Sequence, residues 1–120
     1  ITVFGDFDCD GVTSTALLYS YLSSRGANVD YYIPDRSAEG YGMNMGAIDL
    51  LKSRGTKLII TVDNGISAVD EIAYAKTLGI DVVVTDHHRV GDVLPDAVGP
   101  TIKIALIIVF FQTFFQALDV

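Results

Sequence analysis

The stretch ITVFGDFDCDGVTS, residues 1–14, passes from an apolar segment directly into three aspartates at alternate positions. These are Asp6, Asp8 and Asp10, and Gly11 follows them at once. Carboxylates crowded in this way repel one another, so positive charge is needed if they also lie close together in space. The rest of the sequence indicates what supplies that charge.

Two further apolar segments also end on an aspartate. Residues 57–62, KLIITV, run into Asp63, and residues 80–85, IDVVVT, run into Asp86. Their β-branched and almost uninterrupted composition is typical of strands buried on both faces of a parallel sheet. Residues 28–33 are a further expected strand.

Helical patterns alternate with these strands. Apolar side chains recur at helical spacing over residues 13–25, 44–54 and 67–78, and a glycine follows each segment. Ser67 is expected to be the N-cap of the third helix. The alternation predicts an α/β fold, in which a parallel β-sheet is flanked by helices in a three-layer, Rossmann-like arrangement, here truncated.

The composition limits the classes of function. The chain has 120 residues, enough for one small domain, and half of them are hydrophobic, which favours a packed core. The net charge of −7 argues against a basic nucleic-acid-binding face within this segment alone, but it is compatible with carboxylates that hold cations. A single cysteine, Cys9, forms no internal disulfide and fits a reducing cytoplasm. The start at Ile1 is interpreted as that of an internal fragment without a signal peptide.

The carboxyl ends of parallel strands meet at one edge of a sheet, where functional groups gather. The acidic and imidazole side chains expected at or just beyond this edge are Asp6, Asp8, Asp10, Asp63, Asp86, His87 and His88. Helix N-caps and turns are the commonest roles for a single aspartate after a strand. Three such aspartates beside a histidine pair favour a cluster instead.

Carboxylate oxygens are the ligands that Mg²⁺ and Mn²⁺ prefer, and Mn²⁺ also accepts imidazole. The cluster therefore predicts a pair of Mn²⁺ or Mg²⁺ ions, the arrangement used by two-metal phosphoryl-transfer sites. A calcium loop is rejected, because the twelfth position counted from Asp6 is Leu17 rather than glutamate. The phosphate-binding P-loop motif and the glycine fingerprint of dinucleotide-binding domains are both absent from the sequence.

Four motifs in this order resemble the DHH phosphoesterase superfamily. They are DFDCDG at 6–11, PDRSAEGYGMN at 34–44, TVDNGIS at 61–67 and TDHH at 85–88. The resemblance covers residues 1 to about 98 and is strongest to the RecJ branch, the single-stranded-DNA-specific 5′-to-3′ exonucleases. It implies metal-dependent hydrolysis of phosphodiester bonds in single-stranded DNA, a part in DNA repair and recombination, and a cytoplasmic protein.

The resemblance also implies roles for individual residues. The implied metal ligands are Asp8, Asp10, Asp63 and His87, with Asp6 as a further ligand or as a neighbour of one. Asp86 would orient the histidine pair, and His88 would contact the substrate phosphate. Arg36 and Arg89 are candidate phosphate contacts, although solvated loop arginines are an equal alternative. No role beyond packing is assigned to Tyr41 or Met45. Many members carry histidine where this chain has Phe4, so one ligand of one metal is expected to be missing.

The family pattern stops near residue 98. Residues 1–98 are interpreted as a partial catalytic domain, and residues 99–120 as an apolar tail without family character. We interpret this tail as a frameshifted or chimeric reading rather than a membrane helix, since 102–118 is short for a span and contains Lys103. Neither a fourth motif nor a substrate-holding domain is recognisable, so weak metal binding and little turnover are expected of the chain alone.

Two alternatives remain open. One is another hydrolase of the same superfamily, either an oligoribonuclease or cyclic-dinucleotide phosphodiesterase or a pyrophosphatase, which would carry a first motif containing histidine. The other is a non-catalytic scaffold with a DHH fold, against which the retained Asp8, Asp10, Asp63 and His87 argue. Polarity of digestion and the preference for DNA rest on the resemblance alone.

Overall fold

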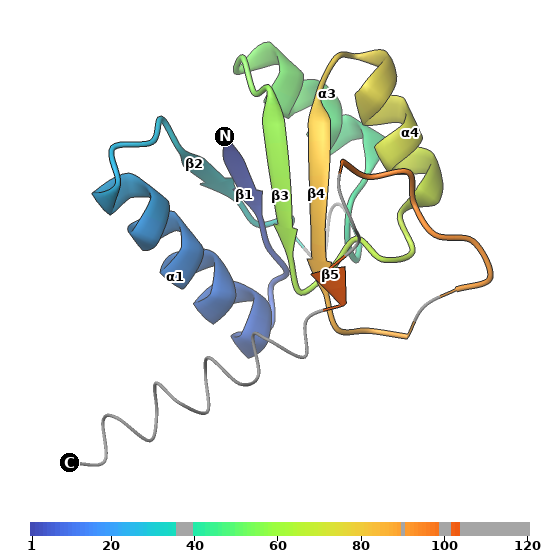
Figure 1. Ribbon diagram of the computed structural model, residues 1–120, viewed down its shortest axis with the longest axis horizontal. Helices are drawn as coiled ribbons and strands as arrows, with labels where there is room; N and C mark the ends of the chain where they lie inside the picture. Colours follow the sequence, from blue (N-terminus) through green and yellow to red (C-terminus); the bar gives the residue numbers. More distant parts are fainter. Residues whose placement is uncertain (36–39, 90, 99–101, 104–120) are drawn as a thin grey trace.

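A computed structural model describes residues 1–35, 40–89, 91–98 and 102–103 of the chain (Figure 1). Among these residues, five parallel strands form one sheet in the order β2-β1-β3-β4-β5. The strands are β1 (Thr2–Phe4), β2 (Asp30–Tyr32), β3 (Leu58–Val62), β4 (Asp81–Asp86) and β5 (Ile102–Lys103). The helices are α1 (Cys9–Ser24), α3 (Met45–Ser53) and α4 (Val69–Thr77).

The helices cover both faces of the sheet. Helix α1 connects β1 to β2, whereas α3 and α4 pack against each other and lead into β3 and β4 (Figure 1). From β1 the chain moves to β2 on one side, and it then moves to β3 and β4 on the other side of β1. Because both kinds of crossover are right-handed, α1 and α4 lie on opposite faces of the sheet. The predicted α/β class, a parallel sheet flanked by helices, is confirmed.

The hydrophobic core lies between the sheet and the pair α3 and α4. Its fully buried side chains include Phe4, Ile48, Leu51, Ile59, Ile72 and Ile80. Burial of an aliphatic or aromatic side chain of this size contributes about 1.5–3 kcal/mol, so this layer holds the sheet in place. The strands of the centre, β1, β3 and β4, are consequently rigid supports for whatever follows their carboxyl ends.

Helix α1 begins at Cys9, four residues before the expected start. Asp8 is its N-cap, and the carboxylate Oδ1 accepts a hydrogen bond from the backbone N–H of Gly11 at 2.9 Å. The third expected helix begins later than predicted, and Ser67 as its N-cap is wrong. The chain first makes a turn in which the N–H of Ala68 donates to the carbonyl of Gly65, and α4 then begins at Val69 with Ala68 as its N-cap.

Small residues let α1 approach the sheet closely. Its buried residues are Gly11, Ser14 and Thr15. A Cβ atom at Gly11 would lie 2.5 Å from the carbonyl oxygen of Asp6, and one at Gly5 would lie 1.9 Å from Oγ1 of Thr15. The first turn of α1 therefore rests directly on the loop that carries Asp6.

The apolar C-terminal segment enters the described structure only as β5. Ile102 pairs with Thr85, and Lys103 with Asp86, at the carboxyl end of β4. Residues 104–120, and with them the frameshift interpretation, lie outside the described residues. Within the ranges that the structure covers, every helix is too short or too polar to cross a bilayer.

The contact between Gly11 and Asp6 leads to a first prediction. We expect Gly11→Ala to lower the free energy of unfolding by about 1–3 kcal/mol, because its methyl group meets backbone that cannot move aside. Gly46, in the first turn of α3, is the matched control, since a Cβ there meets nothing closer than 3.4 Å. Gly46→Ala should instead leave stability unchanged or raise it by up to about 1 kcal/mol. Urea unfolding followed by circular dichroism measures both, and equal effects would contradict the close approach.

Candidate metal centre

Three buried carboxylates lie at the carboxyl edge of the sheet. The register pairs Phe4 with Thr61 and Val62 with Thr85, so the ends of β1, β3 and β4 are level. The aspartates that end or follow these strands are Asp6, Asp63 and Asp86, with exposed fractions of 1%, 5% and 3%. The structure thus brings together at one edge carboxylates that are separated by up to 80 residues in sequence.

Asp63 occupies an unusual backbone conformation. Its φ of 63° is in the left-handed region, where it is alone among the described non-glycine residues. Aspartate and asparagine tolerate this region better than other residues, and such conformations cluster at functional sites. Gly65, with a φ of 102°, completes the turn. The turn lifts the Asp63 carboxylate off the end of β3 instead of continuing the strand.

Asn64 fixes this turn to two strands. Its side-chain Nδ2 donates to the carbonyl of Phe4 at 3.1 Å and to the carbonyl of Val62 at 2.9 Å. Asn64 is fully buried, and its Oδ1 has no hydrogen-bond partner within the described structure. One amide therefore holds the ends of β1 and β3 at a constant separation. Asn64 lies within the TVDNGIS motif, but nothing in that motif predicts this tether between segments that are 60 residues apart in the chain.

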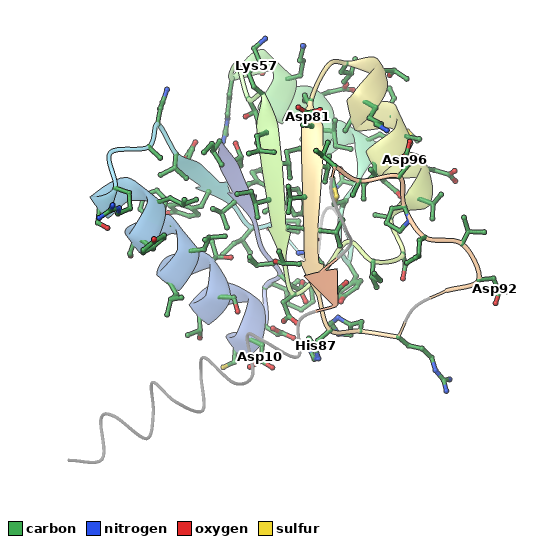
Figure 2. All side chains as sticks on the ribbon, viewed as in Figure 1. Asp10, Lys57, Asp81, His87, Asp92 and Asp96 are labelled. Atoms are coloured by element: carbon green, nitrogen blue, oxygen red, sulfur yellow. The ribbon has the colours of Figure 1, made fainter. Side chains whose placement is uncertain are left out.

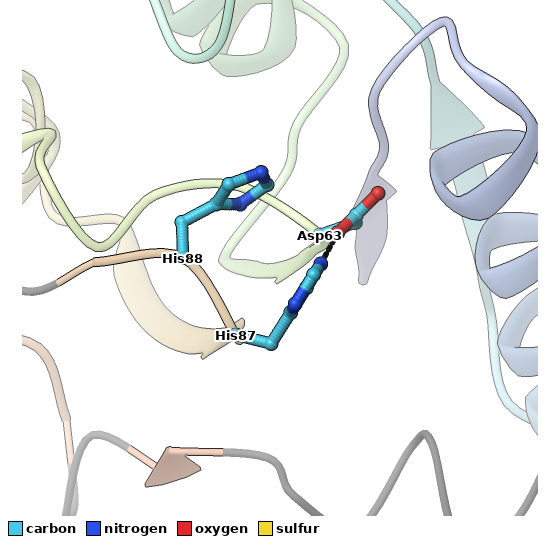
Figure 3. Close-up of side chains that lie close together, drawn as sticks. All are labelled: Asp63, His87 and His88. Atoms are coloured by element: carbon cyan, nitrogen blue, oxygen red, sulfur yellow. Dashed lines mark ion pairs between the residues drawn. The ribbon is translucent and has the colours of Figure 1, made fainter.

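The Asp63 carboxylate lies close to an imidazole, yet one of its oxygens has no hydrogen-bond donor among the described residues. Nε2 of His87 lies 2.8 Å from Oδ1 of Asp63 (Figure 3). The approach is close, yet it lacks the alignment of a hydrogen bond, so Oδ1 remains a buried oxygen without a donor. Burial raises the pKa of Asp63, the negative charge of Asp8 raises it further, and His87 and His88 act in the opposite direction. The folded chain thus disfavours a free negative charge at this carboxylate.

Asp86 holds the second histidine. Its Oδ1 lies 2.7 Å from Nδ1 of His88 and also accepts the backbone N–H of His88 at 3.0 Å. Its Oδ2 accepts the backbone N–H of Ile66 at 2.9 Å. Burial raises the pKa of Asp86, but the two backbone hydrogen bonds and the His88 ring outweigh it, and the pKa is lowered overall. The hydrogen bond to Asp86 in turn raises the pKa of His88.

The two other aspartates of the DFDCDG motif, Asp8 and Asp10, lie at the start of α1. Asp8 is the N-cap and Asp10 is in the first turn, and both are exposed at the same edge of the molecule as His87, as Figure 2 shows for Asp10. Both carboxylates contribute to the raised pKa of Asp63, which shows that their charges act on the same site. Asp8 is thus a helix N-cap, which is the common role considered above for an aspartate after a strand. The capping hydrogen bond uses its Oδ1.

The remaining predicted positions are the two candidate phosphate contacts, Arg36 and Arg89, and the position of Phe4. Arg36 lies outside the described residues, and Arg89 is exposed directly after His88. Phe4, which stands where many family members carry histidine, is fully buried, with its ring centroid 5.4 Å from that of Tyr32. Position 4 therefore points into the core and offers no ligand atom.

The described residues fit a divalent cation. One ligand atom each from Asp63, His87 and His88 lies within 4.8 Å of the others. Atoms bound at about 2.1 Å to a common ion lie roughly 3 Å apart, so small side-chain movements would complete such a set. A cation would also neutralise a carboxylate whose buried Oδ1 has no hydrogen-bond donor in the described part of the chain. Mixed carboxylate and imidazole ligands suit Mn²⁺.

Two aromatic residues complete this edge, and sequence reasoning assigned neither to it. The ring of Tyr41 lies 6.4 Å from that of Phe7 and 6.2 Å from that of His88, both nearly perpendicular. Burial, followed by the charges of Asp6 and Asp86, raises the pKa of Tyr41 to about 12, so its hydroxyl keeps its proton. The available signal was a tyrosine between two glycines inside the motif at 34–44.

Comparisons with known proteins identify the family of this chain. The family described as "DHH family, N-terminal domain" matches residues 1–104. The chain is similar to the single-stranded-DNA-specific exonuclease RecJ of Bacillus subtilis, with 55% identity over 96 residues that cover 80% of this chain and 12% of the relative. It is 51% identical to the Escherichia coli exonuclease of the same name over 98 residues, which cover 81% of this chain and 17% of that one.

Solved structures give the same relationship. A crystal structure of exonuclease RecJ bound to manganese matches with a TM-score of 0.74 and 38% identity, over 88% of this chain and 28% of that one. RecJ from Thermus thermophilus in complex with Mn²⁺ matches with a TM-score of 0.66 and 34% identity, over 80% of this chain and 13% of that one. The chain thus spans less than a third of the proteins that it resembles.

The pair of Asp86 and His88 leads to a prediction for the metal-free chain. The lowered pKa of Asp86 means that its stabilisation is present above its ordinary pKa and is lost as the pH falls through the lowered value. The raised pKa of His88 means that its stabilisation is full below 6.5 and is lost as the pH rises through the raised value. The pair should therefore stabilise the fold most between the ordinary pKa values of its two members, 3.8 for Asp86 and 6.5 for His88.

Asp86→Asn removes the charge that raises the pKa of His88. We expect this variant to lower the pKa of His88 toward 6.5, measured by NMR titration of the imidazole C–H resonances. Asp81, at the opposite end of β4, is exposed and supplies the control, Asp81→Asn, which should leave the pKa of His88 unchanged. An unchanged His88 pKa in Asp86→Asn would contradict the hydrogen bond between them.

Proposed function

Because the chain belongs to the DHH family, we propose that it is the metal-binding part of an exonuclease that hydrolyses phosphodiester bonds in single-stranded DNA. The observation that carries this proposal is the buried Asp63 carboxylate, which faces two imidazoles at the edge of a parallel sheet. The names of its relatives, all single-stranded-DNA-specific exonucleases, supply the substrate. A phosphodiester is the class of substrate that a carboxylate-bound cation pair suits.

The ion-holding residues come from three segments of the edge. In this proposal Asp63 and His87 bind Mn²⁺ or Mg²⁺ from the ends of β3 and β4, and Asp8 and Asp10 reach it from the start of α1. Asp6 lies beneath them as a further ligand or as support for one. The ion, when bound, supplies the positive charge that draws electrons from a phosphodiester and lowers the pKa of bound water.

His88 has a different task in the proposal. Its Nδ1 is held by Asp86, so Nε2 is the free nitrogen of the ring. The same hydrogen bond raises the pKa of His88, which favours the protonated ring as a hydrogen-bond donor to a phosphate oxygen. Asp86, buried and with both oxygens engaged, acts as a positioning residue for His88. Arg36 and Arg89 are the proposed additional phosphate contacts.

The substrate defines where such a protein works and what else it needs. From the names of its relatives we propose a part in DNA repair and recombination and a cytoplasmic location. With a net charge of −7, this chain repels DNA, and the positive charge must come from bound ions and from further parts of a longer protein. Weak metal binding and little turnover are expected of the 120-residue chain by itself.

Metal binding is the first test of the proposal. We expect Mn²⁺ at about one hundred times its dissociation constant to raise the free energy of unfolding by about 2.7 kcal/mol, and Asp63→Asn to abolish most of this gain. Asparagine tolerates the left-handed backbone of position 63, so the loss would reflect the missing charge. Calorimetric titration provides the affinities directly.

The control again is Asp81→Asn, which removes one carboxylate from the opposite edge of the sheet (Figure 2). It should bind Mn²⁺ as the unchanged chain does. Equal Mn²⁺ affinity in Asp63→Asn and Asp81→Asn would reject the proposed centre and favour a non-catalytic scaffold.

Activity separates the proposed roles of the two histidines. In the longest natural protein that contains this chain, we expect His88→Gln to lower kcat on 5′-phosphorylated single-stranded DNA by about 10²–10³-fold, because a donor to the phosphate is lost. Mn²⁺ affinity should stay unchanged in His88→Gln and fall in His87→Gln. Loss of Mn²⁺ affinity in both variants would make His88 a metal ligand instead.

The choice of substrate separates the proposal from its nearest alternative. Long single-stranded DNA and a dinucleotide are compared at equal concentration with the same protein. Faster hydrolysis of the dinucleotide would favour the oligoribonuclease or cyclic-dinucleotide phosphodiesterase.

A further inference from the structure

An exposed aromatic ring stands beside the candidate metal centre. Tyr41 is 60% exposed, although its ring contacts Phe7 and His88. An exposed tyrosine is ordinary in itself, and Tyr21 on α1 has the same exposed fraction. What distinguishes Tyr41 is its position and the way in which its ring is held.

Two nearly perpendicular ring contacts hold Tyr41. The interplanar angle is 84° to Phe7, which lies between Asp6 and Asp8, and 83° to His88, which follows β4. Perpendicular aromatic pairs at these separations are favourable and directional. Contacts from two different segments therefore fix the plane of the ring, while much of its surface remains open to solvent.

The backbone also supports this position. Gly40 and Gly42, on either side of Tyr41, have φ values of 81° and 76°, which only glycine adopts without strain. Gly42 is buried, and Met43 beyond it belongs to the core. The chain thus turns sharply on both sides of Tyr41, and the next residues anchor the turn.

Tyr41 lies within the field of the carboxylate cluster. The charges of Asp6, Asp86, Asp63 and Asp8 all act on its hydroxyl. The ring of His88, the proposed phosphate contact, is its direct neighbour at 6.2 Å. A phosphate bound at this edge would consequently place its own nucleoside, or the adjacent one, beside the open side of the Tyr41 ring.

We propose that Tyr41 is a stacking platform for the nucleobase next to the phosphate that is cleaved, with Phe7 and His88 holding its plane. This inference rests on the proposed function and adds a subsite to it. Stacking on an aromatic ring accepts every base, as a nuclease without sequence preference requires, and it does not depend on positive charge. It therefore suits a surface that is otherwise acidic.

The test compares two ligands that differ only in the base. Deoxyadenosine 5′-monophosphate and 2-deoxyribose 5-phosphate are titrated by calorimetry, with saturating Mn²⁺, into the longest natural protein that contains this chain. A stacked base is worth about 1–3 kcal/mol, so the nucleotide should bind about 5–150-fold more tightly than the sugar phosphate. In Tyr41→Ala this ratio should fall to about one, with the affinity for the sugar phosphate unchanged.

Three further variants make the outcome specific. Tyr41→Phe keeps the ring and should keep the ratio, whereas Tyr41→Leu keeps apolar bulk without a π face and should lose most of it. Tyr21→Ala is the matched control, because Tyr21 is equally exposed but lies near the far end of α1. It should leave the ratio unchanged.

The outcomes separate this inference from the proposed function. A ratio that persists in Tyr41→Ala, or a ratio near one in the unchanged chain that still binds the sugar phosphate, overturns the stacking platform alone. Equal loss of affinity for both ligands in Tyr41→Ala overturns it as well, since Tyr41 would then act on the phosphate. If neither ligand binds in the presence of Mn²⁺, the proposed function fails, and the inference fails with it.

Discussion

The rest of the site depends on one buried carboxylate at the end of the central strand. Burying a charged group is unfavourable unless hydrogen bonds or opposite charges compensate for the lost water. At Asp63 the compensation is partial: His87 approaches one oxygen without hydrogen-bond alignment, and Asp8 adds repulsion. Asp86, at the same edge of the sheet, differs from Asp63. Both of its carboxylate oxygens accept hydrogen bonds, and its pKa is lowered. The two aspartates thus differ in what they hold: Asp86 holds the side chain of His88, whereas Asp63 is the proposed cation ligand.

Stabilising interactions elsewhere keep Asp63 in this conformation. A left-handed backbone at a non-glycine residue costs on the order of 1–3 kcal/mol, although aspartate is among the residues that tolerate it best. The Asn64 amide offsets that cost by joining the carbonyls of Phe4 and Val62, and the aligned register of β1, β3 and β4 makes this bridge possible. The hydrophobic layer beneath the sheet then prevents the strand ends from separating.

The fold could be predicted from the sequence because three buried strands each end on an aspartate. Their β-branched residues and the intervening helical periods determine both the parallel sheet and the edge where Asp6, Asp63 and Asp86 meet. Details that depend on tertiary contacts could not be predicted. The start of α1 depends on the Asp8 cap, and that of α4 on the turn at Gly65. The strand β5 is only two residues long, and no pattern marks it.

For the candidate site, residue types were predictable and partnerships were not. The family resemblance implied that Asp86 orients both His87 and His88. In the structure Asp86 contacts the ring of His88, whereas the ring of His87 lies against Asp63. The two imidazole rings lie side by side, with centroids 4.6 Å apart, so only the folded chain decides which carboxylate each ring reaches. Tyr41 was missed for a related reason. Its neighbours Phe7 and His88 are distant in sequence, and only the folded chain brings the three rings together.

The acidic character of the chain constrains how it can meet a nucleic acid. A protein that binds DNA through lysine and arginine gains affinity because counterions are released from the DNA. A domain with 15 acidic and 8 basic residues gains little affinity in this way. Two kinds of contact remain: cations held between carboxylates, which attract phosphate locally, and aromatic rings, which attract uncharged base faces. In the proposed function, the edge that carries Asp63, His88 and Tyr41 would offer both. Such local attraction at a repulsive surface would hold the substrate only at the reacting phosphate, which would favour release of the product once the bond is cut.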